Sequence, residues 1–363
     1  MKMAKGNIIF ISTKEKELSA IGVRMKYFKE ALKANGYTVT NFEINLKGLR
    51  KYLNYFFRAT PKDLVEASKN ADLVITTTPT LLNAILSHKV ARKNGLPLIV
   101  DVRDVWEEYA KIAHSLMYYL GPIKGIITEY YEALKYASKI SVVTEPIKKY
   151  YEKVLGEEKV VVITNGTDVD VIKCEGKKSD RYIDLAYLAE LDHPYHNVEF
   201  LLDALKDNNL SLIIIGGGKY LAPMKEYAQT LGITNRVSFA GWVSYENLAA
   251  YLCKVRVGVV GRPFSSNIGY LYAIPVKTYD YLAAGLPVIG YGPKGSALEE
   301  FINKNAVGAY VAQPDSKALS NKLVELVTEH EKYIEKARML AMQFDRKKLA
   351  QKMVKIVNDV LSN

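Results

Sequence analysis

Short, nearly continuous apolar runs alternate along the whole chain with longer stretches in which apolar residues recur every three or four positions. The first pattern is typical of parallel strands that are covered on both faces, and the second of amphipathic helices. In the first half the predicted strands are Asn7–Ser12, Thr38–Ile44, Asp72–Thr77, Pro97–Val102, Ile140–Thr144 and Val160–Thr164. After the turn signal Asn165-Gly166 the predicted strands are Ile183–Ala189, Leu212–Ile215, Val237–Ala240, Val257–Val260, Pro287–Tyr291 and Ala309–Val311.

Two such series in one chain predict an α/β protein with two doubly wound, Rossmann-like domains. We place the N-terminal domain at residues 1–168 and the C-terminal domain at residues 169–345. Residues 346–363 are predicted to form a helix that can cross back to the N-terminal domain. Ligands of doubly wound sheets bind beyond the carboxyl ends of the strands, so the residues that follow each strand are the first candidates for a site.

The chain has 363 residues, 49% of them hydrophobic, and a formal net charge of +11. Residues 1–168 hold 26 Lys and Arg against 18 Asp and Glu, a balance of +8, which leaves +3 for the remainder. This bias favours an anionic partner, such as nucleic acid, an anionic membrane or a phosphorylated substrate. The first apolar run is too short for a signal peptide, and no stretch is long enough to span a membrane. Cys174 and Cys253 predict no disulfide framework, which fits a reducing, cytoplasmic compartment.

The segment "IVDVRDVW" gathers Asp101, Arg103 and Asp104 at the end of a predicted strand. Charged groups in such a place are costly to bury unless they are paired or bound to a ligand. One interpretation is an ion pair, Asp101–Arg103 or Arg103–Asp104, that holds the loop. The other is a catalytic site in which an aspartate orients or deprotonates a hydroxyl group.

In the second half, "LIIIGGGKY" places Gly216, Gly218 and Lys219 between a strand and a helix. Glycines there allow backbone N–H groups to approach a phosphate, although Leu221 occupies the third glycine position of a GxGxxG motif. A tight turn between strand and helix explains the same residues without a ligand. The sequence leaves both interpretations open.

Two cations and a carboxylate, Arg262, Lys277 and Asp280, lie near the ends of neighbouring predicted elements. The cations can neutralise a diphosphate, and an arginine can do so with two parallel hydrogen bonds. The carboxylate can accept hydrogen bonds from a ribose or sugar hydroxyl. The alternative is a structural ion pair between Asp280 and either Lys277 or Arg262.

A membrane-contact helix is predicted in "KGLRKYLNYFFR", whose apolar positions recur at helical spacing among basic ones. Its candidate contact residues are Arg50, Lys51, Phe56, Phe57 and Arg58. A second apolar stretch, "HSLMYYLGPIKGII", is broken by Gly-Pro. Packing inside the N-terminal domain is the alternative for both stretches.

The sequence predicts no metal site and no resident cofactor. Its five histidines form no metal-binding pattern, because Pro194 separates His193 from His196 and disfavours a shared helix face. No Walker A loop, GxSxG or paired-cysteine motif is present. No nucleic-acid-binding motif accompanies the basic charge, so we expect no nucleic acid partner.

Taken together, these stretches resemble glycosyltransferase family 4, the retaining nucleotide-sugar enzymes of GT-B fold, over nearly the whole chain. The resemblance is carried by "IGVRMKYFKEALKANGYTV", "LPLIVDVRDVW", "VVVITNGTDVD", "LIIIGGGKYLAPMKEYAQTLGITNRVSFAGWVSYENLAAYL" and, as its most specific motif, "PVKTYDYLAAGLPVIGYGPKGSALEEFI". It implies two domains facing across a cleft, with the donor on the C-terminal domain and the acceptor on the N-terminal domain. No metal is normally needed, so cations and helix N-termini stabilise the departing nucleoside diphosphate.

The resemblance also assigns residues, and this chain departs from the pattern at several of them. Gly22 matches the donor-facing loop, and Asp280 matches the second glutamate of a Glu-x7-Glu pair that holds the ribose. The first glutamate position falls on Tyr272. The Arg and Lys that usually clamp the diphosphate fall on Glu190 and on His196-Asn197. A carboxylate at Glu190 suits the donor sugar's hydroxyls better than a diphosphate.

The interpretation that accounts for most of these features is a retaining glycosyltransferase. It would move a sugar from a nucleotide diphosphate donor to a hydroxyl of a lipid-linked or surface glycan acceptor. We expect it to work at the inner face of the cell membrane, in contact with anionic lipid. Two alternatives are a catalytically silent partner subunit of the same fold and a nucleotide-sugar epimerase.

Overall fold

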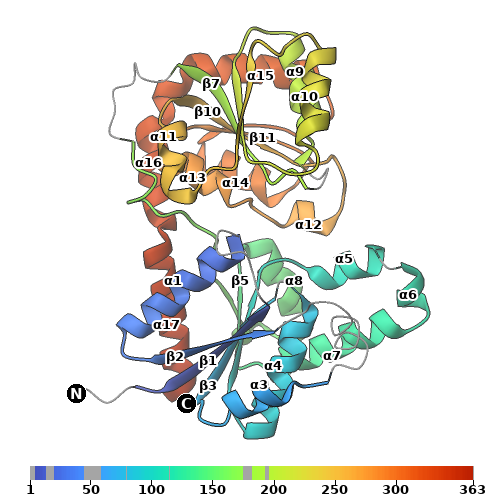
Figure 1. Cartoon of the computed structure of the whole chain (residues 1–363), viewed down its shortest axis with the longest axis vertical. Helices are drawn as coiled ribbons and strands as arrows, with labels where there is room; N and C mark the ends of the chain where they lie inside the picture. The colour runs from blue at the N-terminus through green and yellow to red at the C-terminus, as the bar shows by residue number, and fades with distance from the viewer. Residues whose placement is uncertain are drawn as a thin grey trace. The chain divides into compact units, whose positions relative to one another are not determined.

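The computed structural model describes residues 5–13, 20–44, 59–78, 80–113, 115–174, 182–192 and 196–362. It divides the chain into two compact units (Figure 1). Unit 1 is Met1–Thr164 with Arg346–Asn363, and unit 2 is Asn165–Asp345. The division after Thr164 lies four residues before the predicted boundary at 168.

Unit 1 contains a parallel sheet in the order β2-β1-β3-β4-β5-β6. Its strands are β1 Asn7–Thr13, β2 Thr38–Ile44, β3 Leu73–Thr77, β4 Leu98–Val102, β5 Lys139–Val142 and β6 Val160–Val162. Its helices are α1 Ala20–Ala34, α3 Lys62–Ala67, α4 Leu81–Asn94, α5 Trp106–Ala113, α6 Ser115–Tyr119, α7 Pro122–Tyr136, α8 Glu145–Leu155, the 3-10 turn η1 Glu157–Lys159, and α17 Arg346–Ser362.

The C-terminal helix α17 belongs to the core of unit 1. Its apolar side contributes Leu349, Met353 and Val357 to a cluster that also contains Phe10 of β1 and Phe28 of α1. The central strands β3 and β4 are buried along their whole length, as continuous apolar runs predict for strands covered on both faces. The final helix therefore covers one face of the N-terminal sheet.

Unit 2 contains a second parallel sheet in the order β12-β11-β10-β7-β8-β9. Its strands are β7 Ile183–Leu188, β8 Leu212–Ile215, β9 Val237–Gly241, β10 Val255–Gly261, β11 Val288–Tyr291 and β12 Gly308–Val311. Its helices and 3-10 turns are α9 Val198–Lys206, α10 Leu221–Thr230, η4 Tyr245–Asn247, α11 Leu248–Leu252, α12 Ile268–Leu271, α13 Lys277–Ala283, α14 Ala297–Asn305, α15 Ser316–Glu329, η5 His330–Tyr333, α16 Ile334–Ala341 and η6 Met342–Phe344.

The strand order of each sheet reverses at its first strand. In unit 1, β1 lies between β2 and β3, and in unit 2, β7 lies between β10 and β8. This is the topology of doubly wound sheets, in which ligands bind beyond the carboxyl end of the strands at the point of reversal. The predicted α/β fold with two Rossmann-like units is confirmed.

The two cysteines form a disulfide, contrary to the sequence prediction. Cys174 and Cys253 are 79 residues apart, and folding brings their Cα atoms to 5.3 Å, within the range of a disulfide. Cys174 lies within unit 2, before its first strand β7, and Cys253 caps α11. The spacing alone gave no sign of this approach, because the two residues meet only after the sheet of unit 2 is assembled.

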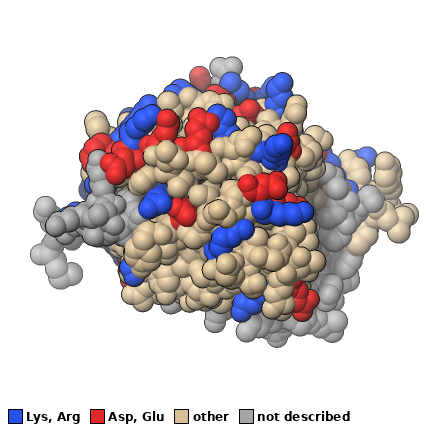
Figure 2. Space-filling view, turned by 90° about the horizontal axis from the view of Figure 1, so that it is seen from above, with Lys and Arg blue, Asp and Glu red and all other residues tan. Residues whose placement is uncertain are grey.

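The surface of unit 2 carries charges of both signs. Figure 2 shows acidic and basic side chains interspersed over the face that is seen from above. The basic excess of the chain, +11 overall, is therefore not gathered on this face. In the part of the chain that the structure describes, no helix is long and apolar enough to cross a membrane.

Candidate functional site

The glycine loop after β8 is shaped by contact with another loop. A Cβ atom at Gly216, which has φ +131°, would overlap the carbonyl group of Ala189. At Gly218 it would overlap the backbone between Leu191 and Asp192. The loops that follow β7 and β8 therefore pack backbone to backbone, which accounts for these glycines without a ligand. Phosphate binding by this loop stays a prediction.

Lys219 and Glu190 lie at the outside of the same two loops. The side chain of Lys219 is exposed, and its backbone N–H donates a hydrogen bond of 3.1 Å to the carboxylate of Asp192. Glu190 is also exposed. Neither side chain is held inside the unit, so their assignment to donor binding also stays a prediction.

Lys277 begins helix α13, beyond the carboxyl ends of the strands, and its ammonium group is buried. Among the described residues its Nζ atom has no hydrogen-bond partner, and it lies 4.5 Å from the ring centroid of Tyr187, which comes from β7. The ring face offers a cation a weak attraction but no hydrogen bond. Burial, together with the positive charge of Arg262, holds the pKa of Lys277 well below its usual value.

Arg262 follows β10 directly and provides a second cation close to the first. Its backbone N–H donates to the carbonyl oxygen of Tyr291 at 2.9 Å, which fixes the start of the loop. Its Nε atom is buried and finds no hydrogen-bond partner in the part of the chain that the structure describes. Among the residues that the structure describes, neither Arg262 nor Lys277 forms an ion pair, so the predicted alternative of a pair with Asp280 is wrong.

Asp280 is buried and is held by a tyrosine that sequence reasoning missed. Its Oδ1 atom accepts a hydrogen bond of 3.0 Å from the hydroxyl of Tyr245. The same hydroxyl oxygen accepts the backbone N–H of Asp168, also at 3.0 Å. Asp280 thus links α13 to η4 and to the start of unit 2. Lys277 and Asp280 sit three residues apart, yet their charged ends meet different partners.

Buried tyrosines fix the loops around these cations. The hydroxyl of Tyr187 donates to the carbonyl oxygen of His196, and that of Tyr291 to the carbonyl oxygen of Asn197, both at 2.6 Å. Tyr281, on α13, donates to the carbonyl oxygen of Ala186 at 3.1 Å. These bonds tie α13 and the segment before α9 to the central strands. Single-sequence patterns cannot separate such tyrosines from the others in a chain that has 26 of them.

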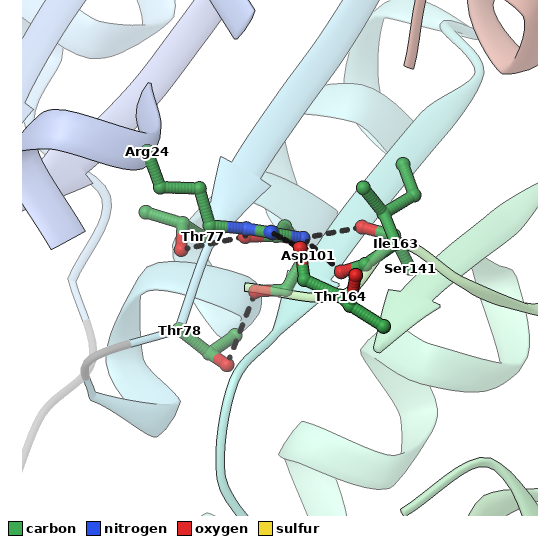
Figure 3. Close-up of polar contacts among 7 residues, drawn as sticks. All are labelled: Arg24, Thr77, Thr78, Asp101, Ser141, Ile163 and Thr164. Carbon is green, nitrogen blue, oxygen red and sulfur yellow. Dashed lines mark hydrogen bonds and ion pairs between the residues drawn. The ribbon is translucent and has the colours of Figure 1, made fainter. Parts of the chain in front are cut away.

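In the strand-end motif of unit 1, Asp101 lies at the centre of a buried hydrogen-bond network (Figure 3). The carboxylate of Asp101 is fully buried and accepts hydrogen bonds from Arg24 of α1 at 2.9 and 3.1 Å. It also accepts the hydroxyl groups of Ser141 at 2.6 Å and Thr77 at 3.3 Å. The predicted catalytic role of Asp101 is therefore corrected, since its oxygens are already occupied and out of reach of a substrate. Its salt bridge is with Arg24, a partner that the sequence did not suggest, and the positive charge of Arg103 also helps to lower the pKa of Asp101.

Arg103 and Asp104 lie beside this centre, between β4 and α5. Arg103 is buried and Asp104 is partly buried. The next helix brings in Glu107, which is fully buried and accepts hydrogen bonds from Tyr151 at 3.0 Å and Tyr131 at 3.1 Å. Burial raises the pKa of Glu107 to about 7. Sequence reasoning missed this carboxyl group, because its helix position gives no sign of its burial.

The remaining predicted residues lie away from the two clusters described above, or outside the described residues. Gly22 lies within the first turn of α1 and not in a loop. Tyr272 caps the end of α12. The predicted membrane residues Arg50, Lys51, Phe56, Phe57 and Arg58 lie outside the described residues.

Comparison with known proteins agrees with this geometry. Residues 168–340 match the family described as "Glycosyl transferases group 1". The chain is 23% identical over 378 residues to the alpha-monoglucosyldiacylglycerol synthase of Streptococcus pneumoniae (strain ATCC BAA-255 / R6), covering 89% of this chain and 82% of that protein.

Solved structures show the same fold. Sucrose-phosphate synthase from Thermosynechococcus elongatus superposes with a TM-score of 0.78 at 16% identity, covering 99% of this chain and 100% of that one. Anabaena HepE in complex with UDP superposes with a TM-score of 0.72 at 17% identity, covering 97% and 100%. The fold is therefore of the GT-B class. With a group 1 domain over residues 168–340, the chain is a nucleotide-sugar glycosyltransferase.

Proposed function

We propose that this chain transfers a sugar, with retention of anomeric configuration, from a UDP-sugar to a hydroxyl of a lipid-linked acceptor. The observation that carries the proposal is the buried, unpartnered ammonium group of Lys277 beside Arg262. Both residues lie within the group 1 domain, beyond the carboxyl ends of its strands. This is where doubly wound sheets bind their ligands.

Two cations near one another in a buried place fit a diphosphate. An isolated buried cation is strongly disfavoured, so the pair gains most from a ligand that brings several negative charges. The guanidinium of Arg262 can bind phosphate oxygens with two parallel hydrogen bonds, and the ammonium of Lys277 acts as a point charge. The same charges would stabilise the diphosphate as it leaves. This arrangement would take over from the family's usual clamp, and no metal ion or cofactor is needed.

The reaction breaks the bond between the sugar's anomeric carbon and the β-phosphate oxygen. The acceptor oxygen forms the new bond to that carbon from the same face, and its proton passes to the departing phosphate. No strong side-chain base is required in such a mechanism, which agrees with the loss of Asp101 as a candidate base. We assign orientation of the acceptor to Asp104, the motif carboxylate that is only partly buried.

The choice of donor and acceptor rests on relatives and on charge. HepE from Anabaena was solved with UDP-glucose, and the pneumococcal relative is named for a glucosyldiacylglycerol product. The balance of +8 over residues 1–168 suits an acceptor embedded among anionic lipids. We propose that the protein acts in the cytoplasm, peripherally at the inner face of the membrane, with no nucleic acid partner.

Incubation with UDP-[13C]glucose and diacylglycerol in mixed vesicles tests the proposal. NMR of the product should show an α-anomeric glucoside, the configuration of the donor. A β-glucoside would overturn the retaining mechanism. A thermal-shift series with UDP, GDP, ADP and dTDP should give its largest stabilisation with UDP. Binding of UDP without any transfer or donor hydrolysis would favour a catalytically silent subunit.

A further inference from the structure

Unit 1 exposes a cluster of large apolar side chains at α5 and α6. Tyr109 is 54% exposed, Leu116 71%, Tyr119 86% and Leu120 72%. We call these four residues the α5–α6 tip. Figure 1 shows α5 and α6 extending outward from the side of the unit 1 sheet, toward the right of the view. Single exposed apolar residues are ordinary, but four of them along two short helices that contact each other mark an interaction surface.

The tip is separate from the core that the same stretch of sequence supplies. Gly121, with φ +101°, turns the chain between α6 and α7, and Pro122 begins α7. After this turn, Ile123 and Ile126 are buried inside unit 1. The segment "HSLMYYLGPIKGII" therefore divides at Gly-Pro, with its first apolar group outside and its second inside. Core packing, the alternative explanation for this stretch, accounts only for the second group.

The tip segment itself carries only basic charges, while the acidic residues that border it, Glu107, Glu108 and Glu129, are buried or paired. The sequence from 109 to 128 contains Lys111 and Lys124 and no Asp or Glu. Lys111 is paired with Glu108 at 2.6 Å, at the inner end of the tip. Lys124 is exposed and forms no ion pair among the described residues. Tyrosine rings with leucines and an unpaired lysine are the composition that settles at a membrane–water interface.

We propose that the α5–α6 tip inserts into the surface of an anionic membrane and holds unit 1 against the bilayer. The proposal rests on the proposed function, because it names the surface through which that enzyme reaches a lipid acceptor. Leucine side chains would enter the acyl boundary, tyrosine hydroxyls would stay at headgroup level, and Lys124 would face the anionic headgroups.

Co-sedimentation of the full chain with vesicles, without donor or acceptor, tests the proposal. The probes are pure phosphatidylcholine vesicles and vesicles of equal parts phosphatidylcholine and phosphatidylglycerol. Binding to the anionic vesicles should fall at least tenfold in Leu116→Ser/Leu120→Ser. It should fall about fivefold at low salt in Lys124→Gln. Val324→Ser/Met339→Ser, which changes exposed apolar residues of unit 2, is the matched control and should bind like the wild type.

The tip fails as a membrane surface if Leu116→Ser/Leu120→Ser binds both vesicles as the wild type does. The proposal is also refuted if light scattering shows that the variant changes only the oligomeric state. A second copy of this chain, and not a membrane, would then cover the α5–α6 tip. UDP affinity, measured on the same variants, should not change. Vesicle binding that persists in a protein unable to bind UDP would refute the proposed function and leave the tip standing.

Discussion

The guanidinium of Arg24 holds both carboxylate oxygens of Asp101, with Nη2 at 2.9 Å and Nε at 3.1 Å. It also donates to the carbonyl oxygens of Ile163 and Thr164, at 2.8 and 2.9 Å. One side chain of α1 thus joins β4 to the last residues of unit 1. Buried hydrogen bonds to a carboxylate and to two carbonyl oxygens give this arginine a structural role in unit 1.

Asp101→Ala should destabilise unit 1 strongly, because it leaves the buried guanidinium of Arg24 without a counter-charge. We expect a loss of about 3–5 kcal/mol in the free energy of unfolding. Urea denaturation measures it, with Asp184→Ala as the control. Asp184 pairs with Arg256 at 2.6 Å in a more exposed place, so its loss should cost about 1 kcal/mol. Equal losses at the two sites would refute the structural role of Asp101.

Lys277→Met should weaken the binding of UDP without lowering the stability of the empty protein. The variant removes a buried cation without a partner, so the empty protein should be as stable as the wild type or more stable. Its affinity for UDP should fall ten- to hundredfold, as expected for loss of about 1.5–3 kcal/mol from a charged hydrogen bond. Thermal unfolding and calorimetric titration measure the two quantities. Lys304→Met, at an exposed position of α14, is the control and should leave UDP affinity unchanged.

The titration of Lys277 gives this site a pH signature. Its pKa is lowered in the folded protein, so over a range below its usual value the unfolded chain keeps a proton that the folded chain has lost. The stability of the empty protein should therefore rise with pH through that range. A bound diphosphate would restore the proton, so UDP binding should take protons up. Titrations in HEPES and Tris, which differ in ionisation enthalpy, should show this, whereas Lys277→Met should not.

Glu107 should make the stability of the wild-type protein fall as pH rises, the reverse of the effect of Lys277. Glu107→Gln should remove this fall. Because the folded carboxyl has a pKa of about 7, it keeps a proton that the unfolded chain loses near pH 4.5. Wild-type stability should fall as pH rises between these values, by up to about 3 kcal/mol. The glutamine can still accept from one tyrosine and donate to the other, so the variant should lack this decline. Urea unfolding at pH 5 and pH 8 is the measurement, and an identical decline in both proteins would contradict it.

Reduction of the Cys174–Cys253 disulfide should destabilise the chain. The bond closes a loop that spans 79 residues, for which the chain-entropy relation gives about 4 kcal/mol. Urea unfolding with and without dithiothreitol should show this difference in the wild type. Cys174→Ser/Cys253→Ser should unfold like the reduced protein and ignore the reductant. Two reactive thiols in the denatured, unreduced chain would show that the bond is not formed in solution.

The sequence allowed the fold to be predicted because the strands of buried parallel sheets are continuous apolar runs. Partners that are distant in sequence could not be found in the same way. Asp101 pairs with Arg24, 77 positions away, and Asp280 bonds Tyr245, 35 positions away, although nearer partners of suitable charge exist. Local spacing favoured those nearer partners. Lys277 was singled out by its place after a strand, whereas its burial and its lack of a partner depend on the packing of unit 2.

Donor binding at Lys277, as proposed above, would tie the persistence of this protein in the cell to its supply of nucleotide sugar. A ligand that binds only the folded chain adds about 2.7 kcal/mol to its stability when present at a hundred times its dissociation constant. Changes of that size alter how often a chain is open to proteases, and hence its abundance. When nucleotide sugar is scarce, the empty protein would lack this stabilisation and would be degraded faster. The amount of transferase would then follow the amount of sugar it has to transfer.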